Sequence, residues 1–342
     1  MSKPFSPAHT DAAPPARSDA TPNDPPSSPV PTAEARPLVV ELAFATPRKL
    51  PKAQDLRGRV VVLDVAFASE ASGGGFDKIT RPLIEGLGTR LAMWVDHHDS
   101  AEHARFSGDP RFFLSTKAEH GACPEMVTPE LVARAGQVDT IVCHTDFDGL
   151  ASAAKWMRGG VEPYAGADDD AWAIDTRLKR PGPIGDRLDR ALRARPQDHG
   201  LFGLVVRHLS TSLADPSLWS VIDAAAAELL PIEAETRRVA ERYVRVSPGV
   251  AVVDVTGGPA PQRATSSRID KTQLLLLGQE KEPVSVVIDR DTVTVAARFD
   301  SGKNFLTLLG LSGGMPTRVS VPKSRLREVL LALGIAPDAY PA

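Results

Sequence analysis

Three short apolar segments, each ending in acidic or imidazole side chains, constrain the fold of this chain of 342 residues more than any other feature. They are RVVVLDVAFA at 59–68, TRLAMWVDHH at 89–98 and VDTIVCHTDFDG at 138–149. Each has the length and composition of a buried strand and meets polar residues at its C-terminal end. The segments FDKITRPLIEGLG, PELVARAG and GLASAAKWMRGG, which lie between or after them, are typical of helices.

Strands that alternate with helices predict an α/β fold with a doubly wound, mainly parallel sheet. In such sheets, ligands bind beyond the carboxyl ends of the strands. Here those ends carry Asp64, Asp96 with two histidines, and the segment from His144 to Asp148. We therefore expect a binding site at this edge of the sheet.

Composition and periodicity divide the chain into four predicted parts. Residues 1–37 are rich in Pro, Ala, Ser, Thr and Asp, and such a segment buries too little apolar surface to offset its ordering entropy, which predicts a disordered tail. Residues 38–215 hold the apolar runs described above. Residues 216–247 are interpreted as a helical linker, broken or kinked at Pro231. Strand-like runs return in 248–342, which are interpreted as a smaller α/β domain that binds substrate.

Charge and cysteine content exclude several classes of protein. The formal net charge is −3, so tight binding to long nucleic acid through a broad basic surface is not expected. Two cysteines, Cys123 and Cys143, cannot form a disulfide framework and are interpreted as reduced thiols of a cytoplasmic protein. We find no apolar run of about 18 residues and no apolar signal core at the start, so neither a membrane span nor export is predicted.

The polar strand ends supply a set of metal-binding residue types. In HTDFDG, three such residues occupy alternate positions, which would place them on one face of an extended segment. The segment AWAIDTR at 171–177 adds Asp175 after another short apolar run. The candidate set is Asp64, Asp96, Asp146, Asp148, Asp175, His97, His98 and His144.

Five carboxylates that share one cleft raise one another's pKa and oppose folding unless a cation balances them. Two divalent ions with a carboxylate between them would do so. Mixed Asp and His ligands without cysteine favour Mn²⁺, with Mg²⁺, Co²⁺ or Zn²⁺ as alternatives. Such a pair of ions is suited to phosphoryl displacement, in which a neighbouring His contacts the phosphate or protonates the leaving group. A single Asp at a strand end is usually a turn former or a cap, so the prediction depends on the combination.

These residues resemble the DHH phosphoesterase superfamily, whose members include single-strand exonucleases, nanoRNases, cyclic dinucleotide phosphodiesterases and manganese inorganic pyrophosphatases. The triplet Asp96-His97-His98 matches the motif that names the superfamily. HTDFDGLASAA looks like its His-x-Asp-x-Asp-Gly motif, and VVLDVAF and AIDTR look like two further metal-binding motifs. The resemblance covers roughly 58–180 and, more loosely, the region after 248.

For the metal centre, the resemblance implies that Asp64 bridges two ions. His144 and one aspartate of HTDFDG would complete the first site. The other aspartate of that motif would join His97 and Asp175 at the second site. The implied metal ligands are therefore Asp64, His97, His144, Asp146, Asp148 and Asp175.

For catalysis, the resemblance implies that His98 faces the phosphate and that Asp96 orients its neighbour His97, while a metal-activated water is the nucleophile. The order of the motifs departs from the family. In most members the His-x-Asp-x-Asp motif comes first, whereas here it follows the DHH triplet. A metal site requires convergence in space rather than a particular chain order, so the permutation does not exclude activity.

The C-terminal region resembles the DHH-associated substrate domain less closely. VTVAARFDSGKNF looks like the strand that carries a substrate-binding arginine, here Arg298. LSGGMPTR looks like a Gly-Gly-Gly-His loop in which Met315 replaces the histidine. The amides of Gly313 and Gly314 would still be able to hold a phosphate, and Arg318 would supply the charge. A structural turn is the alternative.

The sequence therefore predicts a Mn²⁺-dependent phosphodiesterase or phosphatase that acts on short oligonucleotides or nucleotide phosphates. A cyclic dinucleotide phosphodiesterase is the main alternative among enzymes, and hydrolysis of pyrophosphate or polyphosphate is less favoured. A noncatalytic nucleotide sensor is the alternative from another class. Met315 favours that reading, and retention of all five carboxylates opposes it. Neither a membrane partner nor long duplex binding is expected, and homodimer formation is left open.

Overall fold

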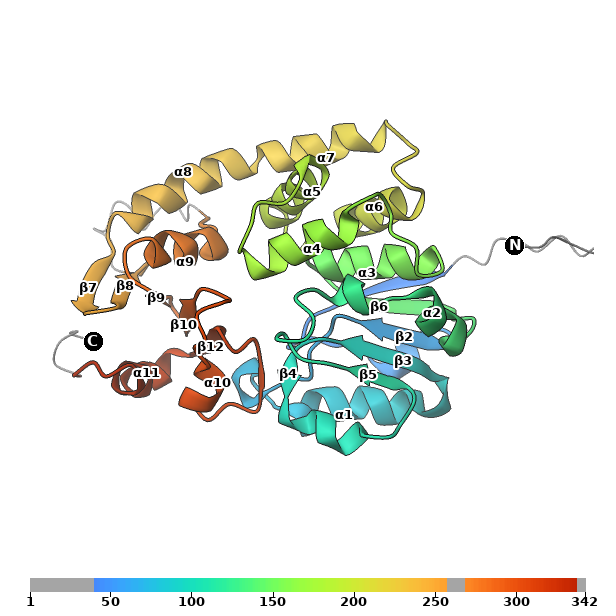
Figure 1. Ribbon diagram of the computed structural model, residues 1–342, viewed down its shortest axis with the longest axis horizontal. Helices are drawn as coiled ribbons and strands as arrows, with labels where there is room; N and C mark the ends of the chain where they lie inside the picture. Colours follow the sequence, from blue (N-terminus) through green and yellow to red (C-terminus); the bar gives the residue numbers. More distant parts are fainter. Residues whose placement is uncertain (1–39, 257–267, 337–342) are drawn as a thin grey trace, which may run out of the picture. The chain divides into compact units, whose positions relative to one another are not determined.

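The computed structural model describes residues 40–256 and 268–336 (Figure 1). The predicted tail, residues 1–37, lies outside the described residues. The described strands form two five-stranded sheets and one two-stranded ribbon. The division of the chain into four parts remains a prediction.

The first sheet contains five parallel strands in the order β1-β6-β2-β3-β5, which confirms the predicted α/β fold with a parallel sheet. The three strands predicted from sequence lie side by side in its centre. The two edge strands, β1 and β5, were not predicted. The bounds are β1 Glu41–Ala45, β2 Val60–Leu63, β3 Leu91–Asp96, β5 Phe112–Leu114 and β6 Thr140–His144.

Both faces of this sheet are buried because successive strand residues point to opposite sides. Val61 packs in one apolar cluster with α3, Phe147–Met157, and the adjacent Val60 packs in another with α1, Phe76–Leu87. Figure 1 shows α1 on one side of the sheet and α3 on the other. The sheet is therefore doubly wound, as predicted.

The chain path creates a switch point in the middle of the first sheet. From β2 it proceeds through β3 to β5 at one edge, and then returns to place β6 on the other side of β2. Ligands of open parallel sheets bind in the crevice at such a point. The carboxyl ends of β2 and β6 border this crevice, and they carry Asp64 and His144.

Helices complete the covering of the first sheet. The segment AWAIDTR, interpreted from sequence as a short apolar run before an acid, instead forms the end of helix α4. Asp175 therefore projects from the last turn of a helix that packs against α3. The remaining helices of this region are α2 Pro129–Ala135, α4 Ala167–Thr176, α5 Pro183–Ala194 and α6 His199–Ser210.

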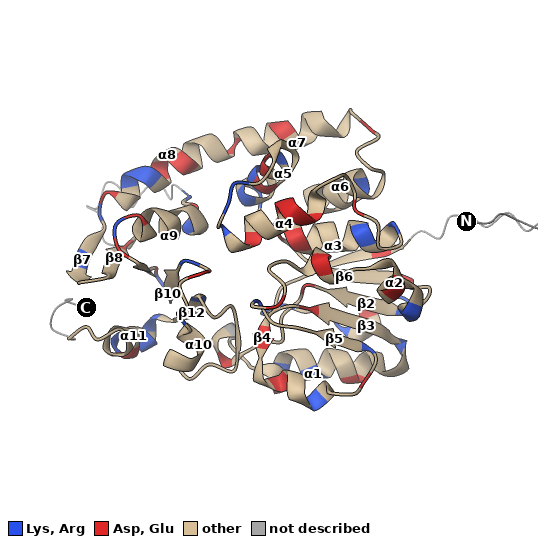
Figure 2. Ribbon diagram, in the orientation of Figure 1, with Lys and Arg blue, Asp and Glu red and all other residues tan. Residues whose placement is uncertain are grey.

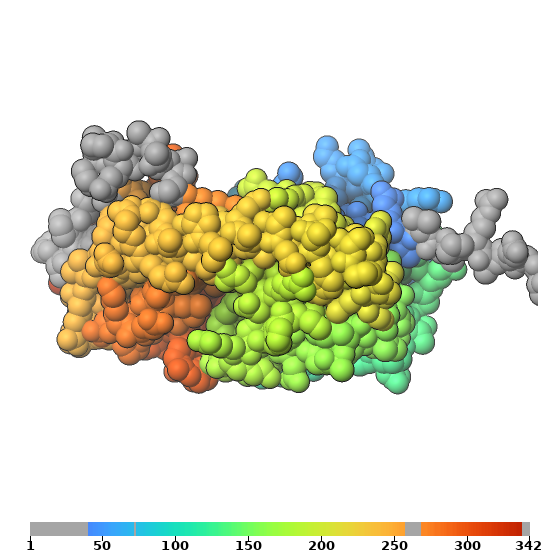
Figure 3. Space-filling model, turned by 90° about the horizontal axis from the view of Figure 1, so that it is seen from above, coloured from blue at the N-terminus to red at the C-terminus, as the bar shows by residue number. Residues whose placement is uncertain are grey.

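The predicted linker contains two helices, α7 Leu218–Ala227 and α8 Leu229–Ala240. The break falls at Glu228, and Pro231 lies in the first turn of α8, where its missing N–H has no helical acceptor. Helix α7 packs on α5, and α8 packs on α9, Lys271–Gln279 (Figure 3). The last residues of the predicted linker form strand β7, Val244–Ser247, rather than helix.

The second sheet is mixed, with the order β12-β10-β9-β8-β7 and one parallel pair, β8 with β9. Its further elements are β8 Val250–Asp254, α9 Lys271–Gln279, β9 Val284–Ile288, β10 Thr292–Ala297, α10 Phe305–Leu308, β12 Arg318–Pro322 and α11 Leu326–Ala332. Strand β11, Gly313–Gly314, pairs instead with β4, Asp99–Ser100, which directly follows the DHH triplet. This two-stranded ribbon thus joins the glycine-rich loop to the residues that follow β3 of the first sheet.

Acidic and basic residues are interspersed along α1, α5 and α8, as Figure 2 shows. None of the described helices combines the length and the apolar character that a membrane crossing requires.

Candidate metal and phosphate site

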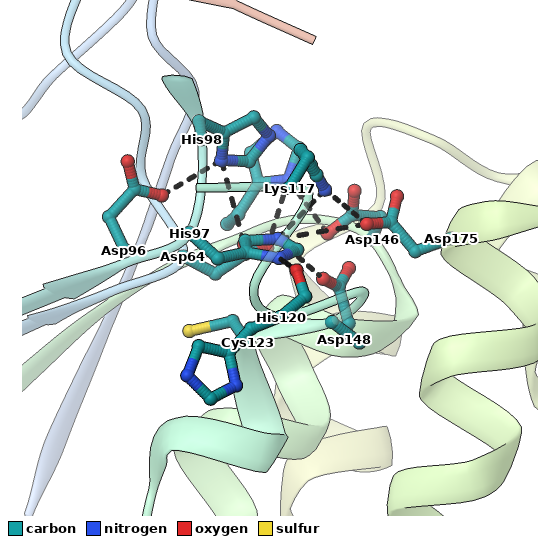
Figure 4. A network of polar contacts seen from close by, with 12 residues as sticks. Asp64, Asp96, His97, His98, Lys117, His120, Cys123, Asp146, Asp148 and Asp175 are labelled. Atoms are coloured by element: carbon teal, nitrogen blue, oxygen red, sulfur yellow. Dashed lines mark hydrogen bonds and ion pairs between the residues drawn. The ribbon is translucent and has the colours of Figure 1, made fainter. Parts of the chain in front are cut away.

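The candidate ligands meet at the carboxyl edge of the first sheet. Asp64 follows β2, the DHH triplet begins at the last residue of β3, and His144 ends β6. Parallel pairing of these three strands brings their ends together. The helical residues Asp148 and Asp175 complete the group that we call the strand-end cluster (Figure 4). The cluster consists of Asp64, His97, His98, His144, Asp146, Asp148 and Asp175.

Asp64 lies at the centre of the strand-end cluster. Its side chain is 1% exposed, and neither carboxylate oxygen has a hydrogen-bond partner among the described residues. Its backbone has a φ of 59°, in the left-handed region that side-chain-bearing residues rarely adopt. A buried anion in a strained conformation is costly to the fold, so the position is suited to a bound cation.

The first donor set contains Asp64, His144 and Asp146. His144 Nδ1 lies 3.6 Å from Asp64 Oδ2 and 2.7 Å from Asp146 Oδ1, but neither Nδ1 nor Asp146 Oδ1 makes a hydrogen bond. Asp146 is the N-cap of α3, so HTDFDG is not extended throughout as predicted. Gly149 permits the tight entry into the helix, since a Cβ there would lie 2.7 Å from the His144 carbonyl oxygen.

The second donor set contains His97, Asp148 and Asp175. His97 Nε2 lies 3.4 Å from Asp148 Oδ2 and 3.6 Å from Asp175 Oδ2, and it also lies 3.2 Å from Asp64 Oδ1. Asp148 is buried in the first turn of α3. The sequence left open which aspartate of HTDFDG belongs to which set. The structure groups Asp146 with His144, and Asp148 with His97.

His97 and His98 have different partners from those that the resemblance implied. His97 Nδ1 lies 2.9 Å from the carbonyl oxygen of His120, which orients the imidazole so that Nε2 points into the cluster. Asp96 was expected to orient His97, but its Oδ1 lies 2.8 Å from His98 Nδ1 instead. The side chains of neighbouring residues diverge at the end of a strand, so Asp96 reaches the second residue of the pair rather than the first.

The Asp96–His98 pair is shifted toward its neutral form. Burial raises the pKa of Asp96, although nearby cations oppose this. Burial, together with the neighbouring Lys117 and His97, holds the pKa of His98 well below its usual value. Both directions favour the neutral forms of the two groups, and the tautomer of His98 decides which of them donates at Nδ1. With Asp96 protonated, Nδ1 would accept and His98 would carry its own proton on Nε2.

Lys117 enters the strand-end cluster although the sequence analysis did not identify it. Its side chain is 3% exposed, its Nζ lies 2.8 Å from His97 Nε2, and it forms an ion pair with Asp175. Burial lowers the pKa of Lys117, but Asp175, Asp148 and Asp64 more than offset this and raise it, so the side chain is an ammonium. A single lysine in a loop gives no sequence signal for burial, because most such lysines are exposed.

A cavity of about 630 Å³ adjoins the cluster. Asp146, Asp148 and Asp175 line it on one side, and the predicted substrate residues Arg298 and Arg318 line it as well. Its volume is in the usual range for small-molecule sites. His98, Gly313 and Gly314 are not among the lining residues.

The arginines differ in their surroundings. Arg298 is 66% exposed at its side chain and pairs with Asp300. Arg318 is half-buried, and burial together with the neighbouring Arg177 lowers its pKa. Arg177, a further cavity residue that sequence analysis missed, is paired with Asp189. Guanidinium groups gathered in one cavity favour a bound anion.

The structure gives Gly313 a packing role. A Cβ at Gly313 would lie 2.8 Å from the carbonyl oxygen of Asp99, so the close pairing of β11 with β4 requires glycine. Phosphate binding by Gly313 and Gly314 stays a prediction. Met315, which the resemblance aligned with a loop histidine, lines the cavity.

The strand-end cluster suits a divalent ion on the chemistry of its donors. Carboxylate oxygens and imidazole nitrogens are the ligands that ions such as Mn²⁺ accept. Buried donors that face one another without hydrogen bonds are the groups that a cation would satisfy, and they include Asp64, His144 Nδ1 and Asp148 Oδ2. The residues present therefore fit a metal ion.

Comparison with known proteins gives the following likenesses. No protein-family model matches the chain, and neither does any curated protein. The structure is similar to a pGpG-specific phosphodiesterase, PggH from Vibrio cholerae, at 11% identity and a TM-score of 0.39, covering 81% of this chain and 97% of that one. It is also similar to exonuclease RecJ bound to manganese, at 13% identity and a TM-score of 0.39, covering 82% of this chain and 76% of that one.

Proposed function

We propose that this protein is a metal-dependent phosphoesterase of the DHH superfamily that hydrolyses short oligonucleotides or nucleotide phosphates. The observation that carries the proposal is the strand-end cluster, in which buried oxygens of Asp64 and Asp148 and the Nδ1 of His144 lack hydrogen bonds beside an arginine-lined cavity. A folded chain tolerates such a cluster only when ligands or internal cations balance its charge.

The preferred site for a divalent ion would be formed by Asp64, His144 and Asp146. Among the described residues, no lysine or arginine bonds to these side chains. When bound, the ion supplies Lewis-acid polarisation of a phosphoryl oxygen and lowers the pKa of water. We expect Mn²⁺, with Mg²⁺ or Co²⁺ as alternatives. The sequence predicts a second ion, for which His97, Asp148 and Asp175 are the available donors.

The protein's own residues would bind and orient the phosphate. Arg298 and Arg318 would pair with its oxygens from the cavity wall. His98 would donate from Nε2 to a phosphoryl or leaving-group oxygen, while Asp96 holds the ring through Nδ1. The adjoining cavity excludes part of the bulk water, which strengthens each of these interactions.

The volume of the cavity favours a short substrate. About 630 Å³ accommodates a small molecule such as a nucleotide phosphate or part of a short oligonucleotide. Acidic and basic residues are interspersed along α1, α5 and α8, so these helices carry no purely basic stripe for a long nucleic-acid backbone (Figure 2). A linear or cyclic dinucleotide fits the same argument, so a cyclic dinucleotide phosphodiesterase is the alternative within this class.

Product analysis with purified protein and added Mn²⁺ tests the proposal. The panel contains RNA of two to about five residues, 3′-phosphoadenosine 5′-phosphate, linear and cyclic dinucleotides, and pyrophosphate. We expect hydrolysis of a nucleotide substrate that stops when a chelator is added and resumes with Mn²⁺. Hydrolysis that persists in chelator would contradict a metal-dependent reaction.

A noncatalytic nucleotide sensor is the second candidate, and one observation favours it. Met315 stands where the family has a loop histidine, so the cavity lacks one imidazole that could contact phosphate. A sensor would bind a member of the same panel in calorimetry and leave it intact. Binding without turnover, with Mn²⁺ shown to be bound, would replace the enzymatic proposal.

A further inference from the structure

The two donor sets differ in one basic side chain. The ammonium of Lys117 lies within the second set, 2.8 Å from His97 Nε2 and in an ion pair with Asp175 (Figure 4). Among the described residues, no lysine or arginine makes a hydrogen bond or ion pair with His144 or Asp146 in the first set. The second set thus already holds a lysine ammonium, and the first set does not.

Lys117 and a metal ion would compete for the same lone pair. His97 Nδ1 faces the His120 carbonyl, so in the neutral imidazole, which is the form that binds a metal ion, Nδ1 carries the ring proton and Nε2 has a single lone pair to offer. Lys117 Nζ is placed to donate to that lone pair. An ion bound to Nε2 would have to displace the ammonium, so the two cannot occupy His97 together.

The loop that carries Lys117 is held in place by its backbone. The amide of Ser115 donates to the Asp96 carbonyl at 2.9 Å, and the amide of Lys117 donates to Asp99 Oδ2 at 3.3 Å. The amide of His120 donates to the carbonyl of Thr116 at 3.0 Å. Two of the acceptors belong to the segment around the DHH triplet. Lys117 is therefore attached to the same strand end as His97 and is not a mobile surface lysine.

The charges agree with one ion rather than two. Asp64 and Asp148 are buried and Asp175 is 14% exposed at its side chain, whereas Asp146 is 48% exposed and solvated. One divalent ion and one ammonium carry the positive charge that balances the three less accessible carboxylates. A second divalent ion beside Lys117 would instead place two cations among the same donors, which is unfavourable in a buried site.

We propose that the Lys117 ammonium takes the place of the second metal ion, so that the protein binds one divalent ion, at Asp64, His144 and Asp146. The inference rests on the proposed metal-dependent function, and it departs from the expectation of two ions. In this site, Lys117 holds His97, Asp148 and Asp175 together as an internal cation. Removal of its side chain opens those donors to a second ion.

The number of bound ions tests this directly and requires no turnover. Purified protein is saturated with Mn²⁺ and freed of excess metal, and bound manganese is measured by elemental analysis and by electron paramagnetic resonance. We expect one ion per chain in the wild type, with the spectrum of an isolated Mn²⁺. We expect two ions per chain in Lys117→Ala, with the spectrum of an exchange-coupled pair.

A matched control separates Lys117 from buried lysines in general. Lys155 is 6% exposed and also pairs with an aspartate, Asp168, but it lies outside the strand-end cluster. Lys155→Ala should still bind one ion. Asp146→Ala should lose the ion in the wild-type background, and Lys117→Ala combined with Asp146→Ala should keep one ion at the second set.

The outcomes distinguish this inference from the proposed function. Two ions per wild-type chain would overturn the role of Lys117 and leave the metal-dependent function standing. One ion in both the wild type and Lys117→Ala would also overturn it. Wild-type protein that binds no ion would overturn the metal centre as a whole. If Lys117→Ala does not fold, the wild-type measurement still tests the expectation of one ion, and two ions there would overturn the inference.

Discussion

Two regions border the candidate site, and they differ in how their polar groups are satisfied. In the strand-end cluster, buried atoms that could bind a metal ion lack a hydrogen-bond partner among the described residues. Both carboxylate oxygens of Asp64 are examples. The second region, which we call the glycine–arginine region, consists of Arg298, Gly313, Gly314 and Arg318. There, Arg298 already pairs with Asp300, and β11 already pairs with β4.

This difference indicates which region requires a ligand. Unpartnered buried groups are expensive for a fold, and a bound cation would satisfy those of the cluster. The glycine–arginine region is stable by its own contacts and gains only additional interactions from a substrate. Substitutions in the cluster should therefore change activity most, and those in the glycine–arginine region should act mainly on substrate affinity and stability.

The largest effect is expected from Asp64→Ala. Asp64 belongs to the first donor set and contacts His97 of the second, so its loss should abolish detectable hydrolysis and reduce bound Mn²⁺. Turnover and bound manganese are measured on the same preparation. Activity that survives this change would show that Asp64 is not a ligand, and the distinction between the two regions would fail.

Asp170→Ala is the matched control for Asp64. Asp170 is also buried, but it accepts hydrogen bonds from the Gly185 amide and the Tyr164 hydroxyl. Its loss should lower the free energy of unfolding by about 1–3 kcal/mol while bound manganese stays unchanged. Metal-free Asp64→Ala loses no such hydrogen bond and should unfold at nearly the wild-type denaturant concentration. A large destabilisation of Asp64→Ala would mean that Asp64 has a structural role.

The next largest effect is expected at His98. If His98 donates a proton to the phosphate or leaving group, His98→Ala should lower kcat by about 10²–10⁴-fold with bound metal unchanged. Single-turnover kinetics with saturating substrate measures this. A loss of manganese in His98→Ala would instead assign His98 to the ligands.

Asp96→Asn tests the protonation state of the pair. In a neutral pair, Asp96 donates to His98 Nδ1, and the amide of asparagine donates in the same way, so kcat should fall less than about tenfold. If Asp96 were an anion that accepts from Nδ1–H, asparagine would impose the wrong tautomer, which in a catalytic triad lowers kcat by about 10⁴-fold. The pH profiles and kcat values of His98→Ala and Asp96→Asn together distinguish a neutral pair from an anionic Asp96.

The sequence was sufficient for the parts of the site that depend on strand ends. The apolar runs before Asp64, Asp96 and His144 predicted the central strands, and parallel pairing alone brings these residues together. The predicted ligand residues lie together, but the sequence did not divide Asp146 and Asp148 between the two donor sets, and metal binding by these residues stays a prediction. Strand β1 was missed because its residues, Glu41–Ala45, have no distinctive polar end and lie at a sheet edge.

The parts that could not be predicted depend on loops and side-chain direction. Lys117 reaches the cluster because its loop is bonded to the end of β3, and a single sequence contains no signal for that contact. The pairing of Asp96 with His98 rather than with His97 is decided by side-chain direction at the strand end. The role of Gly313 depends on a strand more than 200 residues earlier, at Asp99.

A smaller effect is expected from Arg298→Ala in the glycine–arginine region. Arg298 lines the cavity but is largely exposed, so a lost phosphate contact should raise KM by roughly tenfold, or about 1.4 kcal/mol, with little change in kcat. Asp300→Ala is the opposite control, because it frees Arg298 for the substrate and should lower KM slightly. A fall in kcat with unchanged KM would move Arg298 into the chemistry.

The smallest effect on catalysis is expected from Gly313→Ala, which separates packing from phosphate binding. The new Cβ would meet the Asp99 carbonyl at 2.8 Å, and this should lower the free energy of unfolding by about 1–3 kcal/mol in the absence of substrate. Gly203→Ala, in α6 with no atom near its Cβ, should instead raise it by up to about 1 kcal/mol. If Gly313 only packs, KM should change in proportion to the loss of folded protein and no further. If its amide holds phosphate, KM should rise even under conditions in which the variant is fully folded. The glycine–arginine region would then require a bound ligand, a property that we assign to the strand-end cluster alone.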